Sequence, residues 1–327
     1  MKKIVVLGLI LIFSISCKKE KTSTIESTEP KKEDILWTVD YSPDNTLFAV
    51  GGNYDSLYIY NTGSNSIFKK YFFSNTITRA IWHPKDSLIG INIQVSQNKP
   101  GILNLSTNQF IQLDSISVDG ARGMAWSPSG DKIAVGDNDG YLSVFSNMGR
   151  FEKRIKVDPK GITDLDWNPD GKTIAVVGSQ IALYSLDSDE VKVIVDMDEQ
   201  TLHLSVNWHP SGEFFTSGDY GNIENNINPI LSYWSKDGQF LDAYDKGKAP
   251  YRNIYWNKEG SSLYTASDGL RIFNSEGNLL NHIPTTNKLW GIDILEDQNG
   301  LEKVLVTSEK GEILLINAES GTKEIIK

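Results

Sequence analysis

The chain consists largely of short runs in which apolar residues alternate with polar or small ones, the pattern of a β-strand with one buried face. The runs are grouped around a recurring landmark, an aromatic residue that ends one run and leads into a tight turn, as in Trp167-Asn168-Pro169-Asp170-Gly171. Pro, Asp and Gly are residues that tight turns favour. Two further apolar runs follow, at residues 172–178 and 181–185. We therefore predict three successive strands joined by short turns.

This landmark, which we call the turn-leading residue, recurs at regular intervals along the chain. The seven positions are Tyr41, Trp82, Trp126, Trp167, Trp208, Trp256 and, as a weaker match, Ile294, at intervals of 41, 44, 41, 41, 48 and 38 residues. The residues two places earlier are all apolar: Val39, Ala80, Met124, Leu165, Val206, Ile254 and Ile292. The residues three places earlier are all polar or small: Thr38, Arg79, Gly123, Asp164, Ser205, Asn253 and Gly291. This alternation predicts an inner strand with one packed face, and the turn-leading aromatic residues are expected to pack between neighbouring units.

Each repeat closes with a fourth, weaker run, such as residues 190–195. Four short strands per repeat of about 40 to 45 residues are typical of one blade of a β-propeller. We predict an all-β fold, a seven-bladed β-propeller with four antiparallel strands per blade, over residues 35–327. The first blade begins on its innermost strand and the last has its own outer strand, so ring closure is expected to depend on packing of blade 7 against blade 1.

The tight turns and the small-residue second strands resemble those of WD40-type repeat proteins, and the resemblance covers residues 35–327. The Trp-Asp pair that ends the third strand in that family is replaced, in chain order, by Tyr60-Asn61, Leu105-Ser106, Phe145-Ser146, Tyr184-Ser185, Trp234-Ser235, Phe273-Asn274 and Ile316-Asn317. No repeat keeps the Asp, and the family's Gly-His pair is missing. The buried His–Asp hydrogen bonds of the family are therefore not expected here.

The first residues have the features of an export signal. Two lysines precede a 12-residue apolar run, residues 4–15, which is too short to span a bilayer, so residues 1–16 are predicted to be a signal peptide. Cys17, the only cysteine, follows Ser16 in a context that resembles the lipobox of bacterial lipoproteins, although Ser14 stands where Leu is more common. The resemblance implies cleavage before Cys17 and its lipidation; an ordinary signal peptide that happens to contain a cysteine is the alternative.

On this interpretation, residues 17–34 comprise the lipidated cysteine and a tether rich in Lys, Glu, Ser and Thr, which is expected to be disordered. The protein would be held at a membrane of the bacterial cell envelope, outside the cytoplasm. The sequence leaves open whether this is the inner or the outer membrane, and which leaflet.

Candidate binding residues lie four places before the turn-leading residues. The resemblance to WD40 proteins implies that this position meets a partner at the mouth of the central channel. Trp37, Arg122, Arg252 and Trp290 occupy it in blades 1, 3, 6 and 7, and Tyr251 is expected to join them. Trp and Arg are the residues most enriched in binding hot spots. The alternative is that both Trp side chains only seal the seam between blades 7 and 1. Insertions at residues 94–99 and 220–229 are expected on the same rim.

Charge and motif content argue against several classes of function. The net charge is −10 and no basic stripe is present, which argues against nucleic-acid binding. No catalytic, metal-binding or phosphate-binding motif occurs, and His83 and His209 occupy the same turn position in two repeats. We therefore expect no catalytic residue, metal or cofactor.

The function that we predict is a membrane-tethered, non-catalytic scaffold that binds a protein partner on one rim, as a monomer or as part of a hetero-complex. The alternative is an extracytoplasmic enzyme, such as a lactonase-like hydrolase, or a receptor for a small ligand or glycan at the channel mouth. Acidic or His side chains that converge in the channel from several blades would favour this alternative.

Overall fold

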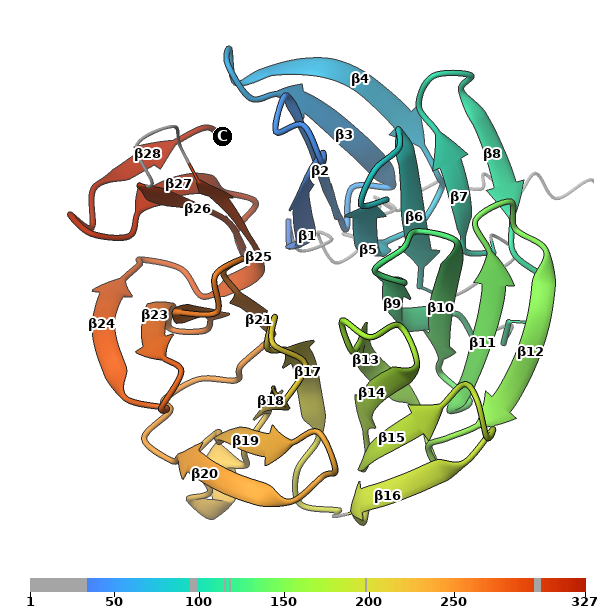
Figure 1. The fold of residues 1–327 in the computed structure, drawn as a ribbon. Coiled ribbons are helices and arrows are strands. Elements are labelled where there is room, and N and C mark those ends of the chain that lie inside the picture. Colours follow the sequence, from blue (N-terminus) through green and yellow to red (C-terminus); the bar gives the residue numbers. More distant parts are fainter. Residues whose placement is uncertain (1–33, 95–98, 115, 118, 198, 297–300) are drawn as a thin grey trace, which may run out of the picture. The chain divides into compact units, whose positions relative to one another are not determined.

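The computed structural model describes residues 34–94, 99–114, 116–117, 119–197, 199–296 and 301–327. The predicted signal peptide, Cys17 and the tether up to residue 33 lie outside this range. In the described part, no helix has the length and apolar character needed to cross a membrane. The described residues form seven four-stranded antiparallel sheets arranged in a ring, so the predicted seven-bladed β-propeller is confirmed (Figure 1).

In every sheet the strand order follows the chain, and the first strand lies innermost. The strands of blades 1 to 4 are β1 (Leu36–Tyr41), β2 (Leu47–Gly52), β3 (Ser56–Asn61), β4 (Ser66–Phe72), β5 (Ile77–Trp82), β6 (Leu88–Ile93), β7 (Gly101–Asn104), β8 (Gln109–Gln112), β9 (Ala121–Trp126), β10 (Lys132–Asp137), β11 (Tyr141–Ser146), β12 (Phe151–Lys156), β13 (Ile162–Trp167), β14 (Thr173–Gly178), β15 (Ile181–Ser185) and β16 (Val191–Val195). Those of blades 5 to 7 are β17 (His203–Trp208), β18 (Phe214–Asp219), β19 (Leu231–Ser235), β20 (Phe240–Tyr244), β21 (Asn253–Trp256), β22 (Ser262–Ala266), β23 (Gly269–Asn274), β24 (Leu279–Pro284), β25 (Leu289–Glu296), β26 (Glu302–Ser308), β27 (Ile313–Asn317) and β28 (Lys323–Ile325).

The apolar core is divided into seven layers, each lying between two neighbouring blades. The turn-leading aromatic residues lie in or at the edge of these layers and are buried, as the sequence predicts. Trp126 Nε1 donates to Ile81 O in blade 2 at 3.2 Å, and Trp167 Nε1 donates to Ala125 O in blade 3 at 3.1 Å. These two indoles therefore pack between blades and also bond to the backbone of the preceding blade, whereas the buried Nε1 groups of Trp82, Trp208 and Trp256 have no hydrogen-bond partner among the described residues.

The tight turns are linked from blade to blade by side chains in the predicted histidine position. His83 Nε2 lies 2.7 Å from Gly130 O in the next turn, and His209 Nε2 lies 2.9 Å from Gly260 O. Gly130 has a φ of +81°, and a Cβ at this residue would lie 2.3 Å from His83 Nε2. Glycine is required there both by the left-handed backbone and by the histidine ring.

The seam between blades 7 and 1 is closed without a shared strand in the described part of the chain. An apolar layer with Leu36, Phe48, Leu305 and Ile313 fills it, as in the other interfaces. Across the seam, Thr307 Oγ1 donates to Leu36 O at 2.9 Å. The expectation that blade packing closes the ring agrees with this arrangement.

The predicted end of the third strand in blade 2 is wrong by two residues. Leu88 pairs with Asn104, as Leu47 pairs with Asn61 in blade 1, so the equivalent pair is Leu103-Asn104 and not Leu105-Ser106. Two leucines spaced by two residues lie on the same face of a strand, so alternation alone did not distinguish them. Asn104 Oδ1 accepts hydrogen bonds from the N–H groups of the next turn, at 3.0 Å each, which ends the strand there.

Candidate binding face and central cavity

Four of the five predicted binding residues come together at the end of the ring where the innermost strands begin. The Trp37 and Trp290 rings, from blades 1 and 7, meet edge to face with 4.5 Å between their centroids. Arg252 Cζ lies 3.7 Å from the Trp290 ring centroid, and Arg122 Cζ lies 5.9 Å from that of Trp37. We call these four residues the Trp–Arg cluster. Because Arg122 belongs to blade 3 and Trp37 to blade 1, the arginine reaches over the end of the central channel.

A backbone irregularity accounts for the direction of three of these side chains, and blade 6, which carries Arg252, lacks it. The pairing between the first and second strands shifts at the start of the innermost strand in blades 1 to 5 and 7, which leaves Trp37 and Arg122 outside the regular ladder. A β-bulge of this kind re-aims a side chain that alternation would otherwise direct to a packed face. Trp37 is fixed further by a hydrogen bond from its Nε1 to Asn53 Oδ1 at 2.9 Å.

The cluster holds two cations with little electrostatic compensation. Burial lowers the pKa of both Arg122 and Arg252 from its ordinary value. Among the described residues neither guanidinium forms an ion pair, and Glu309 acts on Arg252 only from a longer distance. The buried Arg122 Nε and Trp290 Nε1 groups have no hydrogen-bond partner in the described part of the chain. These two N–H groups are buried, so what the cluster offers to an incoming acceptor is the positive charge of its two partly exposed arginines.

Tyr251 is not part of this surface, and its prediction as a contact residue is wrong. Its side chain is fully buried in the layer between blades 5 and 6, beside Tyr233 and Ile254. Neighbouring residues of an extended segment point in opposite directions, so the exposure of Arg252 directs Tyr251 inward. Tyr220, instead of Tyr251, lies beside Arg252. It opens the predicted insertion in blade 5, is 47% exposed, and its ring centroid lies 5.8 Å from Arg252 Cζ.

The two predicted insertions are described to different extents. The one in blade 5 contains a short 3-10 helix, Ile223–Asn225. Residues 95–98 of the other insertion lie outside the described residues.

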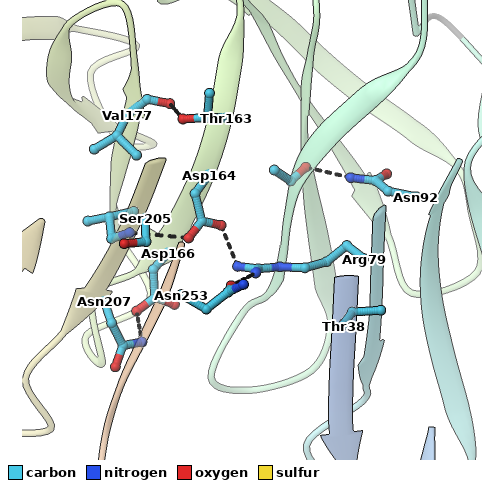
Figure 2. Close-up of polar contacts among 12 residues, drawn as sticks. Thr38, Arg79, Asn92, Thr163, Asp164, Asp166, Val177, Ser205, Asn207 and Asn253 are labelled. Carbon is cyan, nitrogen blue, oxygen red and sulfur yellow. Dashed lines mark hydrogen bonds and ion pairs between the residues drawn. The ribbon is translucent and has the colours of Figure 1, made fainter. Parts of the chain in front are cut away.

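Below the Trp–Arg cluster, Arg79 spans the channel. It comes from β5 of blade 2, and its guanidinium bonds to Asp164 of blade 4 and, at 2.5 Å, to Asn253 Oδ1 of blade 6 (Figure 2). Asp164 Oδ2 also accepts the Val206 N–H of blade 5 at 3.1 Å. These three side chains occupy the polar position that the sequence identifies three places before the turn-leading residue. A single cation thus ties together blades that are not neighbours.

A second set of polar side chains lies one place before the turn-leading residues, at positions that were not predicted from the sequence. Asp40 accepts the backbone N–H of Trp82 in the next blade at 2.5 Å. Asp166 does the same for Trp208 at 2.8 Å, and Asp293 for Tyr41 at 2.6 Å. In blade 5 the residue is Asn207, whose Oδ1 accepts the Trp256 N–H at 2.8 Å. These side chains satisfy backbone donors on the exposed edge of each neighbouring inner strand.

The space enclosed by these side chains is a cavity of about 930 Å³. Exposed turn residues, including Pro43, Pro84 and Lys258, line one end, so the cavity opens on the face that carries the tight turns. Arg79 and Asn253 line it at depth, whereas the Trp–Arg cluster does not. The cavity therefore opens at the turns, and the Trp–Arg cluster lies outside it.

The carboxyl groups around this cavity have unusual proton affinity. Burial raises the pKa of both Asp166 and Asp293 to about 7. Burial also raises the pKa of Asp40, with a further contribution from the neighbouring Asp293. The charge of Asp293, then burial, raises the pKa of Tyr255, with smaller contributions from Asp40 and Asp166. In the described part of the chain, no three acidic, His or Cys side chains are placed to hold a metal ion.

Acidic side chains from blades 1, 4 and 7 thus converge in the channel, an arrangement that favours the alternative of an enzyme or a small-ligand receptor. Each of these carboxylates also bonds to the backbone, so convergence alone does not assign a role to them.

Comparison with known proteins agrees with the propeller. The family model described as eukaryotic translation initiation factor eIF2A matches residues 131–292, a little under half of the chain. A 90-residue stretch is 36% identical to the tricorn protease homolog of Saccharolobus solfataricus, covering 27% of this chain and 8% of that protein. Over 274 residues, the chain is 22% identical to minichromosome loss protein 1 of Schizosaccharomyces pombe, covering 79% of this chain and 32% of that protein.

The chain therefore spans less than a third of the length of either of these curated relatives. Together with the seven four-stranded sheets, the family match supports a WD40-like seven-bladed β-propeller. A propeller of this kind supports a protein-binding role.

Proposed function

We propose that this protein is a non-catalytic scaffold, held at a membrane of the bacterial cell envelope by lipid on Cys17, and that it binds a protein partner through the Trp–Arg cluster. The observation that carries the proposal is the cluster itself. Two partly exposed Trp rings and two arginines without ion-pair partners among the described residues lie together at the end of the ring where the innermost strands begin. The wide and rigid ring of blades supports them.

The composition of the cluster suits a protein surface. Trp and Arg supply the largest energies at protein interfaces, and they do so from the centre of a contact area that excludes water. A partner carboxylate or carbonyl would meet the partly exposed guanidinium groups of Arg122 and Arg252, while an apolar side chain would cover the Trp rings. The acidic net charge of the chain makes a long polyanion such as nucleic acid a poor fit.

The binding test is recovery of a crosslinked partner from cells that produce the tethered protein. Combining Arg122→Ala with Arg252→Ala removes both cations and leaves the Trp pair in place. We expect partner recovery to fall at least tenfold, because hot-spot truncations cost about 2 kcal/mol or more. The melting temperature should change little. Arg150→Ala with Lys172→Ala removes the same charge from exposed positions elsewhere and should leave recovery intact.

Trp290→Ala in combination with Arg252→Ala tests the aromatic half of the cluster. Loss of recovery with a nearly unchanged melting temperature supports binding. A large loss of stability with full recovery of the partner would instead assign both residues to sealing the seam.

The anchor is tested separately, by labelling cells with a fatty-acid analogue. We expect the wild-type protein to be labelled and to sediment with membranes, and Cys17→Ser to lose both properties. Labelling that persists in Cys17→Ser, or an unlabelled wild-type protein, would contradict lipidation at this residue.

A further inference from the structure

The central cavity has more negative charge than the fold needs. The stapling position, one place before the turn-leading residue, holds Asp in blades 1, 4 and 7 but Asn in blade 5. Asn207 Oδ1 accepts the Trp256 N–H at 2.8 Å, the same distance at which Asp166 Oδ2 accepts the Trp208 N–H. A neutral amide therefore makes the inter-blade hydrogen bond as well as a carboxylate does.

Neutral donors compensate for these carboxylates only in part. Asp40 accepts one backbone N–H group and Asp293 accepts two. Asp166 accepts two backbone N–H groups and the side-chain amide of Asn207. Removing an ionised carboxylate from water is unfavourable unless a cation or several donors compensate for it. Arg79 is the cation that acts on Asp40 and Asp166, and it is already engaged by Asp164 and Asn253. Lys258 and Glu302, which also line the cavity, have opposite charges. Asp40, Asp166 and Asp293 consequently lie around one space without a cation of their own among the described residues.

We propose that the cavity binds an organic cation, an ammonium or guanidinium group, that enters from the turn face and lies among Asp40, Asp166 and Asp293. The volume of about 930 Å³ is within the range of small-molecule sites. A metal ion fits the site poorly, since no three described side chains are close enough to ligate one. An organic cation instead needs negative potential and room, and both are present. This site lies at the opposite end of the channel from the Trp–Arg cluster and is independent of the function proposed there.

Tyr255 completes the site from blade 6. Its side chain lines the cavity, remains 38% exposed, and lies within electrostatic range of all three carboxylates. An aromatic face beside carboxylates is a favourable environment for a guanidinium or ammonium group, through cation–π attraction. The same chemistry is offered by a free amine and by a Lys or Arg side chain of a protein, and the experiment separates these sources.

The test is calorimetric titration of the full chain in non-ionic detergent. Argininamide is the charged probe and citrullinamide is its neutral counterpart of nearly the same shape. We expect argininamide to bind and citrullinamide to bind at least tenfold more weakly. Asp40→Asn, Asp166→Asn and Asp293→Asn, made singly, should each weaken argininamide binding by about tenfold, because each removes one charge and keeps the hydrogen-bond acceptor. Asp237→Asn, at an exposed turn, is the matched control and should have no effect.

A blocked pentapeptide, Gly-Gly-Arg-Gly-Gly, distinguishes the sources. Tighter binding of the peptide than of argininamide assigns the site to a protein side chain, and tighter binding of argininamide assigns it to a free small cation. The three Asn variants are independent, so one that fails to fold leaves two to test. Equal binding of argininamide and citrullinamide, no binding of argininamide at millimolar concentration, or unchanged binding in the folded Asn variants would overturn the proposal.

Discussion

Asp293 at the seam between blades 7 and 1 gives the sharpest test of how the ring is held closed. Its Oδ2 accepts the Tyr41 N–H at 2.6 Å across the seam, and its Oδ1 accepts the Ile294 N–H at 2.8 Å. Asp293→Ala leaves the Tyr41 N–H without this acceptor in a buried position. We expect the free energy of unfolding to fall by about 1–3 kcal/mol, the cost of an unsatisfied buried donor.

Asp293→Asn keeps an acceptor oxygen and removes the charge, so its effect depends on pH. Burial raises the pKa of Asp293 to about 7 in the folded protein, against about 3.9 in an unfolded chain. The folded state therefore holds a proton that the unfolded state has released. The stability that this group contributes is fully present below about pH 4, declines as the pH rises, and is lost above about pH 7.

The Asn side chain does not titrate, so Asp293→Asn does not lose stability in this way as the pH rises. Relative to the wild type it should gain stability between pH 4.5 and pH 8, by at most about 4 kcal/mol, since each pKa unit corresponds to about 1.4 kcal/mol. Urea unfolding followed by tryptophan fluorescence at the two pH values measures the difference, with the exposed Asp237→Asn as control. A difference between Asp293→Asn and wild type that is constant with pH, or that shrinks as the pH rises, would refute the reasoning.

Two further predictions concern side chains that join blades. Arg79→Met removes the cation that bridges Asp164 and Asn253, and should lower the free energy of unfolding by about 3–5 kcal/mol because Asp164 remains buried without its partner. Adding Asp164→Asn should restore part of that loss, and a double variant that is less stable than Arg79→Met would contradict the ion pair as the cause. Trp126→Ala should cost about 3–5 kcal/mol in urea unfolding by opening a cavity between blades 2 and 3. A loss below about 1 kcal/mol would show that the indole is not part of the interface core.

The architecture was predictable because it is encoded locally and repeated. The turn-leading residues and the alternation before them identify seven inner strands, and the small residues that follow identify the second strands. The Trp–Arg cluster was predictable for the same reason, since a position fixed within each repeat becomes a position fixed on the ring. Blade 7 was the weakest match, and there β25 continues past Ile294 to Glu296 instead of turning.

The features that were missed depend on contacts between repeats. Nothing local distinguishes Asp40, Asp166 and Asp293 from solvated acidic residues, because their hydrogen-bond donors are in the next blade. Aligning the stapling position across the seven repeats would have shown that it holds Asp in three of them and Asn in one. Arg79 of blade 2 bonds to side chains of blades 4 and 6, and only the closed ring shows that these blades lie within reach of one side chain. Alternation shows that Tyr251 and Arg252 point in opposite directions, but it does not show which of them points into the core. The inward direction of Tyr251 follows only once Arg252 is known to be exposed.

The division of the core into seven layers has a consequence for how the chain is made. Six layers join blades that are consecutive in the sequence, so each can form soon after its second blade has been synthesised. The seventh joins Leu36 and Phe48 to Leu305 and Ile313, near the other end of the chain. Until the last repeat is complete, the first blade presents a bare apolar flank to its surroundings. If the chain crosses a membrane unfolded, that flank is the surface a chaperone on the far side would have to cover longest.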